Sequence, residues 1–508
     1  MSGDRVSPAG SCVLAIDQGT SGSKCLLVDA GGEIVARGGA PLSEGHPRPG
    51  WVNQDPEEVW QSVRQAVRVC LSHEDPARVL AVGLSTQRES YLLWDRASGE
   101  AVSPLISWQD QRTSLGDDLR QPAVAALVRE RSGLPLDPMF SASKAAWLLD
   151  TYDPGRERSA RGELCLGTVD SWLLFKLTGE HLTEHGNASR TQLLNVRTGE
   201  WDEELLRLFR VPRAALPEVR SSNGPFPALR GLAPLPDGTP IHAVMGDSHS
   251  ALFAHGAFTP GAVKATYGTG SSVMGLLEGA EGLDPGLCLT VAWSLDGRRQ
   301  LAAEGNIRSA GAALRWVAEL LNLTPGELAD LAATVEDSPV TLVPGFGGLG
   351  APWWDEEAVG LISNLSLGTT RADLAYAAVD SIAQQVADVV EAVNRSAGQL
   401  GALYTDGGPT ANGHLMQRQA DLMGTAVLRS QHAELSALGV AHLAGLGAGL
   451  WDWGALRALP RERQTFRPGL DAAARRRLRD RWLAAVDRAR LRSSPSALPA
   501  LSPSVKGL

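Results

Sequence analysis

The sequence predicts an α/β protein with two lobes, and three observations favour this fold class. Predicted strands and helices alternate along the chain, and its 508 residues suffice for two or three domains with well-buried cores. In addition, two turns rich in Gly, Ser and Thr, at residues 17–24 and 268–272, each separate two apolar runs. This repetition suggests a duplicated domain, with one copy in each half of the chain.

The first half opens with a strand-rich stretch and one well-marked helix. A helix is expected from Asp55, because Asp is a good N-cap, Pro56 suits the first helical turn, and apolar residues then recur at helical spacing. Short apolar runs predict strands at residues 12–16, 25–28, 34–36 and 79–84. The last of these strands delivers the polar stretch 85–89 to its carboxyl end, where open α/β sheets place ligand-binding groups.

The second half shows the same alternation. A long helix is expected after Thr370, because Asp373 completes a capping pair and a regular apolar stripe follows. Glycines at residues 406–409 predict a turn that opens a further helix. Other elements expected here are strands at residues 263–267, 273–277 and 402–405, helices at 412–423 and 470–490, and a frayed tail at 493–508. We expect the lobes to span residues 11–257 and 258–492.

Composition excludes several classes of protein. The formal net charge of −10 is spread without long runs of one sign, so no basic surface for nucleic acid is expected. The five cysteines are scattered and lack Cys-x-x-Cys spacing, which is typical of buried thiols in a reducing compartment. No apolar stretch is long enough to cross a bilayer. We therefore expect a cytoplasmic protein that does not bind membranes.

The first glycine-bearing turn is a candidate phosphate site. Glycines let the backbone aim N–H groups at phosphate oxygens, while Thr20 and Ser21 add hydroxyl donors and Lys24 adds a positive charge. Asp17 ends the first strand, where its carboxylate could hold the water shell of a Mg²⁺ ion. An ordinary polar hairpin turn remains the alternative for this stretch alone. The hypothesis is an ATP site with Mg²⁺ arriving on the nucleotide.

Three further groups of residues favour chemistry over packing. Arg88 and Glu89 offer donors and acceptors suited to vicinal hydroxyls, with a structural ion pair as the alternative. Trp108 offers a flat apolar surface, although a single Trp is more often a core residue. Asp247 follows the apolar run 241–245 and could take a proton from an attacking hydroxyl, with a helix N-cap as its alternative.

Taken together, these stretches resemble the FGGY family of carbohydrate kinases, and within it the glycerol kinases. The match runs from about residue 13 to residue 451. It is carried by Asp17-Gln18-Gly19-Thr20, Gln87-Arg88-Glu89, Ser107-Trp108-Gln109-Asp110, Gly167-Thr168-Val169-Asp170, Asn187-Ala188-Ser189-Arg190, Tyr267-Gly268-Thr269-Gly270, Asp406-Gly407-Gly408 and Ala437-Leu438-Gly439.

The resemblance implies two actin-like lobes of the ribonuclease-H type, with ATP and acceptor meeting in a cleft between them. It implies ATP-dependent phosphorylation of a primary hydroxyl of a small polyol or sugar, and a homodimer or homotetramer. Asp247 would be the general base, Arg88 and Glu89 would bind acceptor hydroxyls, and Trp108 would face the acceptor carbons. Asp17 would serve Mg²⁺, and the nucleotide would be held by Thr20, Ser21, Gly22, Lys24, Thr269, Gly311, Gly408 and Asn412.

Three positions depart from the glycerol kinase pattern. Met139 stands where a Tyr is usual, Ser248 where a Gln follows the catalytic Asp, and Ser272 where a Phe packs against the glycerol carbons. All three lie in the expected acceptor site, which leaves the acceptor open between glycerol, a longer polyol and a four- or five-carbon ketose. A nucleotide-binding regulator without sugar chemistry is the remaining alternative.

Overall fold

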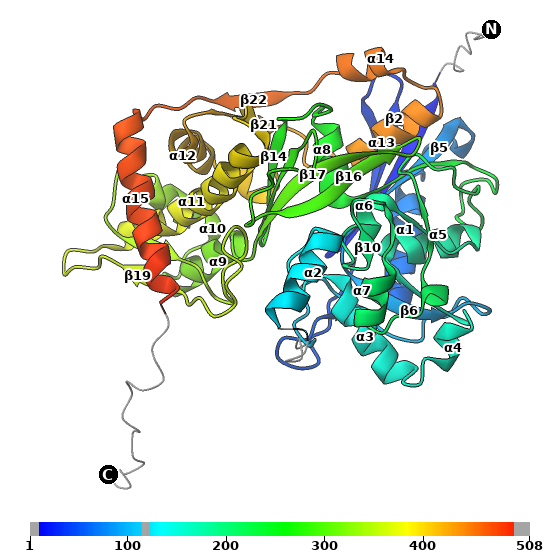
Figure 1. Cartoon of the computed structure of the whole chain (residues 1–508). Helices are drawn as coiled ribbons and strands as arrows, with labels where there is room; N and C mark the ends of the chain where they lie inside the picture. Colours follow the sequence, from blue (N-terminus) through cyan, green and yellow to red (C-terminus); the bar gives the residue numbers. More distant parts are fainter. Residues whose placement is uncertain (1–9, 114–118, 120, 492–508) are drawn as a thin grey trace, which may run out of the picture.

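The structure is a computed structural model that describes residues 10–113, 119 and 121–491. The chain forms two lobes, each built on a β-sheet with helices packed against it (Figure 1). The first half of the chain forms one lobe, and most of the second half forms the other. The predicted α/β class is therefore confirmed.

The first lobe contains a five-stranded sheet in the order β13-β5-β1-β2-β3. Strands β1, β2 and β3 form an antiparallel meander, while β5 and β13 continue the sheet in parallel on the other side of β1. Their bounds are β1 Cys12–Gly19, β2 Gly22–Asp29, β3 Ile34–Pro41, β5 Val79–Thr86 and β13 Ile241–Gly246. The parallel strands thus end at one edge of the sheet.

The first hairpin turn is shorter than the predicted turn at residues 17–24. Pairing continues to Gly19 and Gly22, so only two residues form the turn. The polar side chains that suggested a turn have partners instead: Ser23 Oγ lies 2.7 Å from Ser62 Oγ, and Gln18 accepts from Gln87 at 3.1 Å. Satisfied polar groups are tolerated inside a sheet, which explains the extended strands.

The second lobe repeats the strand order of the first. Its seven-stranded sheet, β16-β17-β15-β14-β20-β21-β22, contains the meander β14-β15-β17 with β20 and β21 parallel to β14. The bounds are β14 Val263–Tyr267, β15 Ser271–Leu276, β16 Cys288–Leu295, β17 Arg298–Ile307, β20 Ala402–Asp406, β21 Ala426–Ser430 and β22 Arg463–Phe466. The order of β17-β15-β14-β20-β21 matches β3-β2-β1-β5-β13, which confirms the predicted duplication.

Helix ends follow the predicted caps. Asp55 accepts from two backbone N–H groups at the start of α1, and Thr370 and Asp373 form a capping box at the start of α11. The longer helices are α1 Pro56–Cys70, α2 Pro122–Ser132, α3 Ser141–Tyr152, α5 Val169–Thr178, α8 Asp247–Ala254, α9 Gly311–Leu320, α10 Pro325–Ala332, α11 Arg371–Ala397, α12 Gly413–Met423, α13 Leu435–Gly447 and α15 Ala472–Ala489.

Smaller elements complete the lobes. A four-stranded sheet, β4-β7-β6-β8, lies in the first lobe, and short strand pairs lie in both lobes. The strands are β4 Asn53–Gln54, β6 Tyr91–Asp95, β7 Leu105–Ile106, β8 Leu164–Thr168, β9 Leu182–Glu184, β10 Leu194–Asn195, β11 Glu200–Trp201, β12 Glu218–Arg220, β18 Thr341–Val343 and β19 Leu361–Ser363; the short helices are α4 Glu157–Ala160, α6 His185–Ala188, α7 Glu203–Leu208 and α14 Trp453–Ala458.

Helices α8 and α13 join the two lobes. Although α13 comes from the second half of the chain, it packs on the first-lobe strands β1, β5 and β13 as well as on α8. The approach needs glycine, since a Cβ atom on Gly439 would lie 1.8 Å from the Ser250 carbonyl oxygen and one on Gly83 2.5 Å from that of Val440. The predicted lobe limits, 11–257 and 258–492, remain predictions, and the predicted tail at 493–508 lies outside the described residues.

The hairpin β16–β17 also reaches the first lobe. Leu289 donates its backbone N–H to the Gly133 carbonyl at 2.8 Å, and Ser222 donates to the Ser294 carbonyl at 2.7 Å. One edge of the second-lobe sheet is therefore hydrogen-bonded to the first lobe, which positions the residues of β17 described below.

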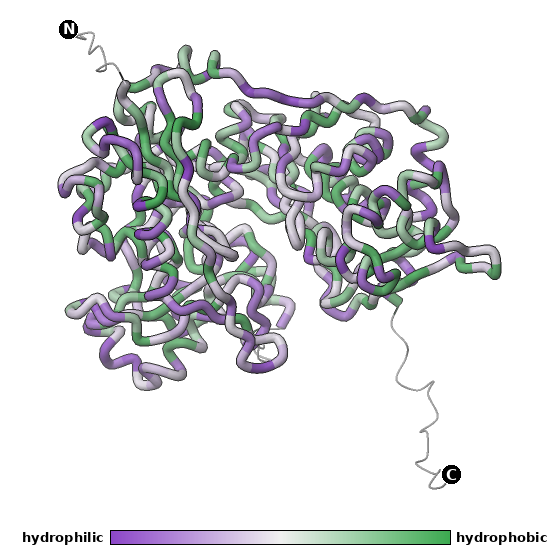
Figure 2. Tube along the Cα trace, turned by 180° about the vertical axis from the view of Figure 1, so that it is seen from behind, coloured by the Kyte–Doolittle hydropathy of each residue, from purple (hydrophilic) through white to green (hydrophobic). Residues whose placement is uncertain are grey.

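Hydropathy follows this arrangement. Hydrophobic stretches run along the central strands and helices, whereas the crossing segment that carries β22 is hydrophilic (Figure 2). Within the described part of the chain, no helix combines the length and the apolar character that a membrane crossing requires.

Candidate active site

Three parallel strands of the first lobe bring acidic groups to one edge of the sheet. In the registers of β1, β5 and β13, Asp17 pairs with Ser85 and Gly246 with Thr86, so Asp247 follows at the same edge. Asp17 accepts a hydrogen bond from Ser85 Oγ at 2.8 Å. Burial raises the pKa of Asp17 to about 6, and the negative charge of Asp247 adds to the rise. The two predicted carboxylates therefore interact.

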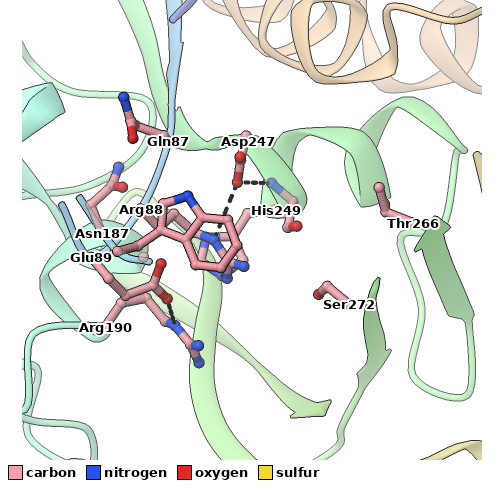
Figure 3. Close-up of polar contacts among 12 residues, drawn as sticks. Gln87, Arg88, Glu89, Asn187, Arg190, Asp247, His249, Thr266 and Ser272 are labelled. Atoms are coloured by element: carbon pink, nitrogen blue, oxygen red, sulfur yellow. Dashed lines mark hydrogen bonds and ion pairs between the residues drawn. The ribbon is translucent and has the colours of Figure 1, made fainter. Parts of the chain in front are cut away.

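Asp247 is the first residue of α8 and is held by two partners (Figure 3). Its Oδ1 accepts from the Ser248 N–H at 2.5 Å and lies 3.2 Å from Arg88 Nε. Gly246 occupies the cap position, so the N-cap alternative for Asp247 is wrong. Its side chain is 37% exposed, and burial raises its pKa while Arg88 opposes the rise. Asp247 is thus a fixed carboxylate that a small molecule can reach.

Arg88 and Glu89 belong to a buried ionic network that joins both lobes. Arg88 donates two hydrogen bonds to Glu304 on β17, at 2.9 and 2.8 Å, and Arg190 lies 3.0 Å from the same carboxylate. Arg190 Nε donates to Glu89 at 2.6 Å, as Figure 3 shows. Glu89 has φ of 61°, a left-handed backbone that is uncommon for this residue and that turns it away from β5.

The network changes the interpretation of Arg88 and Glu89. Among the described residues no Arg88–Glu89 ion pair occurs, because each residue has a separate partner. Burial alone would raise the pKa of Glu304, but Arg190 and Arg88 outweigh that effect and hold it well below its usual range. Glu304 is therefore ionised, and it fixes both guanidinium groups.

Three residues predicted to line the acceptor site lie around this network: Trp108, Ser272 and Met139. Trp108 donates its indole N–H to Thr20 Oγ1 at 3.0 Å, which connects it to the first predicted phosphate turn. Ser272 Oγ donates to Glu304 at 2.9 Å. Met139 packs in an apolar cluster with Phe140, whose ring lies below the Arg190 guanidinium. Met139 thus contributes to the apolar cluster on which the network packs. Among the described residues its side chain makes no polar contact.

The first phosphate turn lies next to the carboxylates. Thr20 and Ser21 form the tip of the β1–β2 hairpin, and Ser21 and Lys24 are exposed. Lys24 pairs with Asp17 across the hairpin, and its positive charge opposes the rise of the Asp17 pKa. A Cβ atom on Gly22 would lie 2.5 Å from the Ala40 carbonyl oxygen, so the close approach of β3 requires glycine. The turn can present hydroxyl and N–H donors to an anion.

The second-lobe residues predicted for the nucleotide lie around β14 and β20. Thr269 is exposed on the β14–β15 turn. Gly311 begins α9 close to this turn, and a Cβ atom on Gly311 would lie 2.5 Å from the Gly268 carbonyl oxygen. Gly408 follows β20 with open space beside it, and Asn412 caps α12.

These groups fit a nucleotide. The Asn412 Nδ2 donor is buried and has no protein partner among the described residues, while the N-terminus of α9 favours negative charge. Arg315 on α9, which the sequence did not single out, is 3.4 Å from Thr269 Oγ1. A cation and two glycine-bearing turns therefore meet at one place.

The residues fit a Mg²⁺ ion that is carried by the nucleotide. Across the described ranges, no cluster of three or more His, Cys, Asp or Glu side chains has the geometry of a metal site. Mg²⁺ commonly uses one or two carboxylates together with phosphates and waters, and Asp17 meets that need. Mg²⁺ would lower the raised pKa of Asp17.

Three residues of this network were not predicted from the sequence: Glu304, Arg190 and Asn306. Arg190 does lie within the motif Asn187-Ala188-Ser189-Arg190. A usable signal existed for Glu304, because this acidic residue directly follows the apolar run Leu301–Ala303 inside a strand. A charge in such a place is costly unless it is paired. The partners themselves were not predictable, since Arg88 and Glu304 lie 216 residues apart.

Comparison with known proteins agrees with this geometry. Residues 12–254 match the N-terminal domain of the FGGY family of carbohydrate kinases, and residues 263–448 match its C-terminal domain. A glycerol kinase of Citrifermentans bemidjiense is 45% identical over 482 residues, covering 92% of this chain and 97% of that protein. An apulose kinase of Pectobacterium atrosepticum is 42% identical over 489 residues, covering 94% of this chain and 98% of that protein.

A solved structure supports the same assignment. Plasmodium falciparum glycerol kinase with ADP superposes with a TM-score of 0.88 at 28% identity, covering 95% of this chain and 99% of that one. Both lobes are therefore actin-like. The chain belongs to the FGGY family of carbohydrate kinases.

Proposed function

We propose that this protein transfers the γ-phosphoryl group of ATP to a primary hydroxyl of glycerol or of a similarly small polyol or sugar. The observation that supports this most is the placement of Asp247, a reachable carboxylate held by Arg88 at 3.2 Å beside a buried network of acceptor-type groups. Several relatives over nearly the whole chain are named glycerol kinase. These two facts favour a hydroxyl acceptor over a carboxylate or an amine.

In this proposal each side chain has one task. Asp247 accepts the proton of the attacking hydroxyl, and its raised pKa brings its basicity nearer to neutral pH. Arg88 and Glu89 hold neighbouring hydroxyls, because each keeps hydrogen-bonding capacity beyond its contacts within the protein. The two turns and the start of α9 hold the phosphates, and Asp17 would hold Mg²⁺, which neutralises phosphate charge during transfer.

A second candidate keeps the chemistry and changes the acceptor. Ser272 and Ser248 are smaller than the Phe and Gln usual in glycerol kinases, which leaves room for a longer polyol or ketose. The apulose kinase relative is 42% identical to this chain and is named for a different acceptor than glycerol. A regulator without catalysis is disfavoured, since Asp247, Arg88 and Glu89 are all present and connected.

The test is an ADP-release assay with Mg²⁺-ATP and a panel of acceptors. The panel contains glycerol, erythritol, ribitol, xylitol, dihydroxyacetone, erythrulose, ribulose and xylulose, and phosphorus NMR identifies the phosphorylated position. We expect acceptor-dependent ADP release that Asp247→Asn abolishes, whereas the exposed Asp237→Asn control keeps wild-type rates. Release that is no greater with any acceptor than without one would overturn the proposal.

A further inference from the structure

The end of β17 and the residue that follows it carry three polar side chains that reach the first lobe. Glu304 and Asn306 alternate along the strand, so their side chains lie on the same face of the sheet, and Arg308 directly follows the strand end at Ile307. Each contacts a first-lobe group: Glu304 binds Arg88, Asn306 Oδ1 accepts from Arg190 at 3.1 Å, and Arg308 pairs with Asp137 at 2.5 Å. The carboxyl-terminal end of β17 therefore borders the acceptor-side network.

Glu304 has no capacity left for a ligand. Its Oε1 accepts from Arg88, from Ser272 Oγ at 2.9 Å and from Asn306 Nδ2 at 3.1 Å, and its Oε2 faces Arg88 and Arg190. The side chain is 0% exposed. It orients its neighbours and does not itself touch an acceptor.

Ser272 and Asn306 keep the free capacity that Glu304 lacks. They pair in the β15–β17 register, and both are partly exposed. Within the described residues, Ser272 Oγ donates once and accepts from no group, while Asn306 uses one of its two Nδ2 hydrogens and one Oδ1 contact. An accepting oxygen, a free N–H donor and a carbonyl lone pair therefore remain side by side, and a hydroxyl group can donate to and accept from such a pair.

We propose that Ser272 and Asn306 form a hydroxyl-binding pair in the acceptor site and select a polyol or ketose of four or five carbons. This inference rests on the proposed function and names its substrate class. Arg190 links Asn306 to Glu89, so the pair lies one hydrogen-bonded residue beyond the groups assigned to the first hydroxyls. A triol whose hydroxyls engage Asp247, Arg88 and Glu89 has none left for the pair, whereas a longer acceptor does.

The test compares kcat/KM for glycerol with kcat/KM for the four- and five-carbon members of the panel. The variants are Asn306→Ala and Ser272→Ala, and the matched control is Gln61→Ala, which removes an exposed amide from α1. We expect each site variant to lower kcat/KM for the preferred longer acceptor by roughly tenfold, as expected for the removal of one hydrogen bond. Glycerol kcat/KM should fall clearly less than that, and circular dichroism spectra like that of wild type report that each variant is folded.

The outcomes separate the possible roles. Equal losses for glycerol and the longer acceptor would mean that Asn306 acts only by holding Arg190, and would overturn the proposal. Unchanged kinetics in both variants would overturn it as well. A wild-type enzyme that accepts glycerol alone would refute this pair while leaving the proposed function intact, and a wild-type protein inactive with every acceptor would refute both.

Discussion

Replacing Glu304 by Gln should weaken the fold and the acceptor site together. The substitution keeps the shape of the side chain but removes the negative charge that faces two buried guanidinium groups. Arg88 then retains Asp247 as an ionic partner, and Arg190 retains Glu89. Each guanidinium is left with one carboxylate partner in place of two, although both arginine side chains are buried.

The size of the effect follows from the interactions that Glu304 makes with the two guanidinium groups. It accepts two hydrogen bonds from Arg88, at 2.9 and 2.8 Å, and lies 3.0 Å from Arg190. Removing one partner from a buried ion pair typically costs about 3–5 kcal/mol, and the amide oxygen of Gln recovers part of this. We expect about 3 kcal/mol, or a fall in Tm of roughly 6–12 °C for a lobe of this size.

The depressed pKa of Glu304 gives the effect a pH dependence. A carboxylate whose folded pKa lies below its unfolded value stabilises the protein above the unfolded pKa of about 4.3, and that stability is lost as the pH falls through the folded pKa. The difference between wild type and Glu304→Gln should therefore be full at pH 7 and become smaller in acid.

Thermal unfolding followed by tryptophan fluorescence and by circular dichroism measures this difference. Glu163→Gln, which removes the charge from the exposed Arg161–Glu163 pair, is the matched control and should change Tm little. The acceptor KM of Glu304→Gln should rise while the ATP KM stays near wild type. A Tm change as small as that of the control would show that Glu304 does not hold the network together.

Three further outcomes are expected. Asp247→Asn should lower kcat about 10²–10⁴-fold with little change in the ATP KM, and turnover above about a tenth of wild type would exclude a general-base role. Burial raises the pKa of Asp247, and a general base must be ionised to act. The kcat/KM for the acceptor should therefore fall as the pH falls through that raised pKa. A pH profile of kcat/KM whose acid side falls at an ordinary Asp pKa of about 3.9 would contradict this. Arg315→Ala should raise the ATP KM several-fold and leave the acceptor KM unchanged. Initial rates with each substrate varied in turn measure both constants, and an unaltered ATP KM would exclude Arg315 from the nucleotide site.

Local signals in the sequence predicted much of the fold. The N-caps of α1 and α11 depend on residues within three positions of each other, and both helices begin where predicted. Asp17 and Asp247 were each singled out because they follow an apolar run, and the registers of β1, β5 and β13 place both at one edge of the sheet. Short-range rules therefore located the carboxylates without knowledge of the topology.

Contacts across long sequence distances could not be predicted in this way. Arg88 looked like a partner for its neighbour Glu89, but the left-handed backbone at Glu89 separates the two and the positive charge turns to Glu304. Helix α13 belongs to the second half by sequence, yet it covers the first-lobe sheet because glycine at position 439 permits a close crossing with α8. Both outcomes depend on how the two lobes pack, which periodicity and capping do not encode.

In the proposed acceptor site, Glu304 would couple acceptor binding to the arrangement of the lobes. If β17 moved away from the first lobe, Arg88 and Arg190 would each be deprived of a carboxylate partner while remaining largely enclosed, and that cost opposes the motion. The hydrogen bonds from β16 to the first lobe oppose it as well. The groups of the proposed acceptor site are therefore held in place by contacts within the protein.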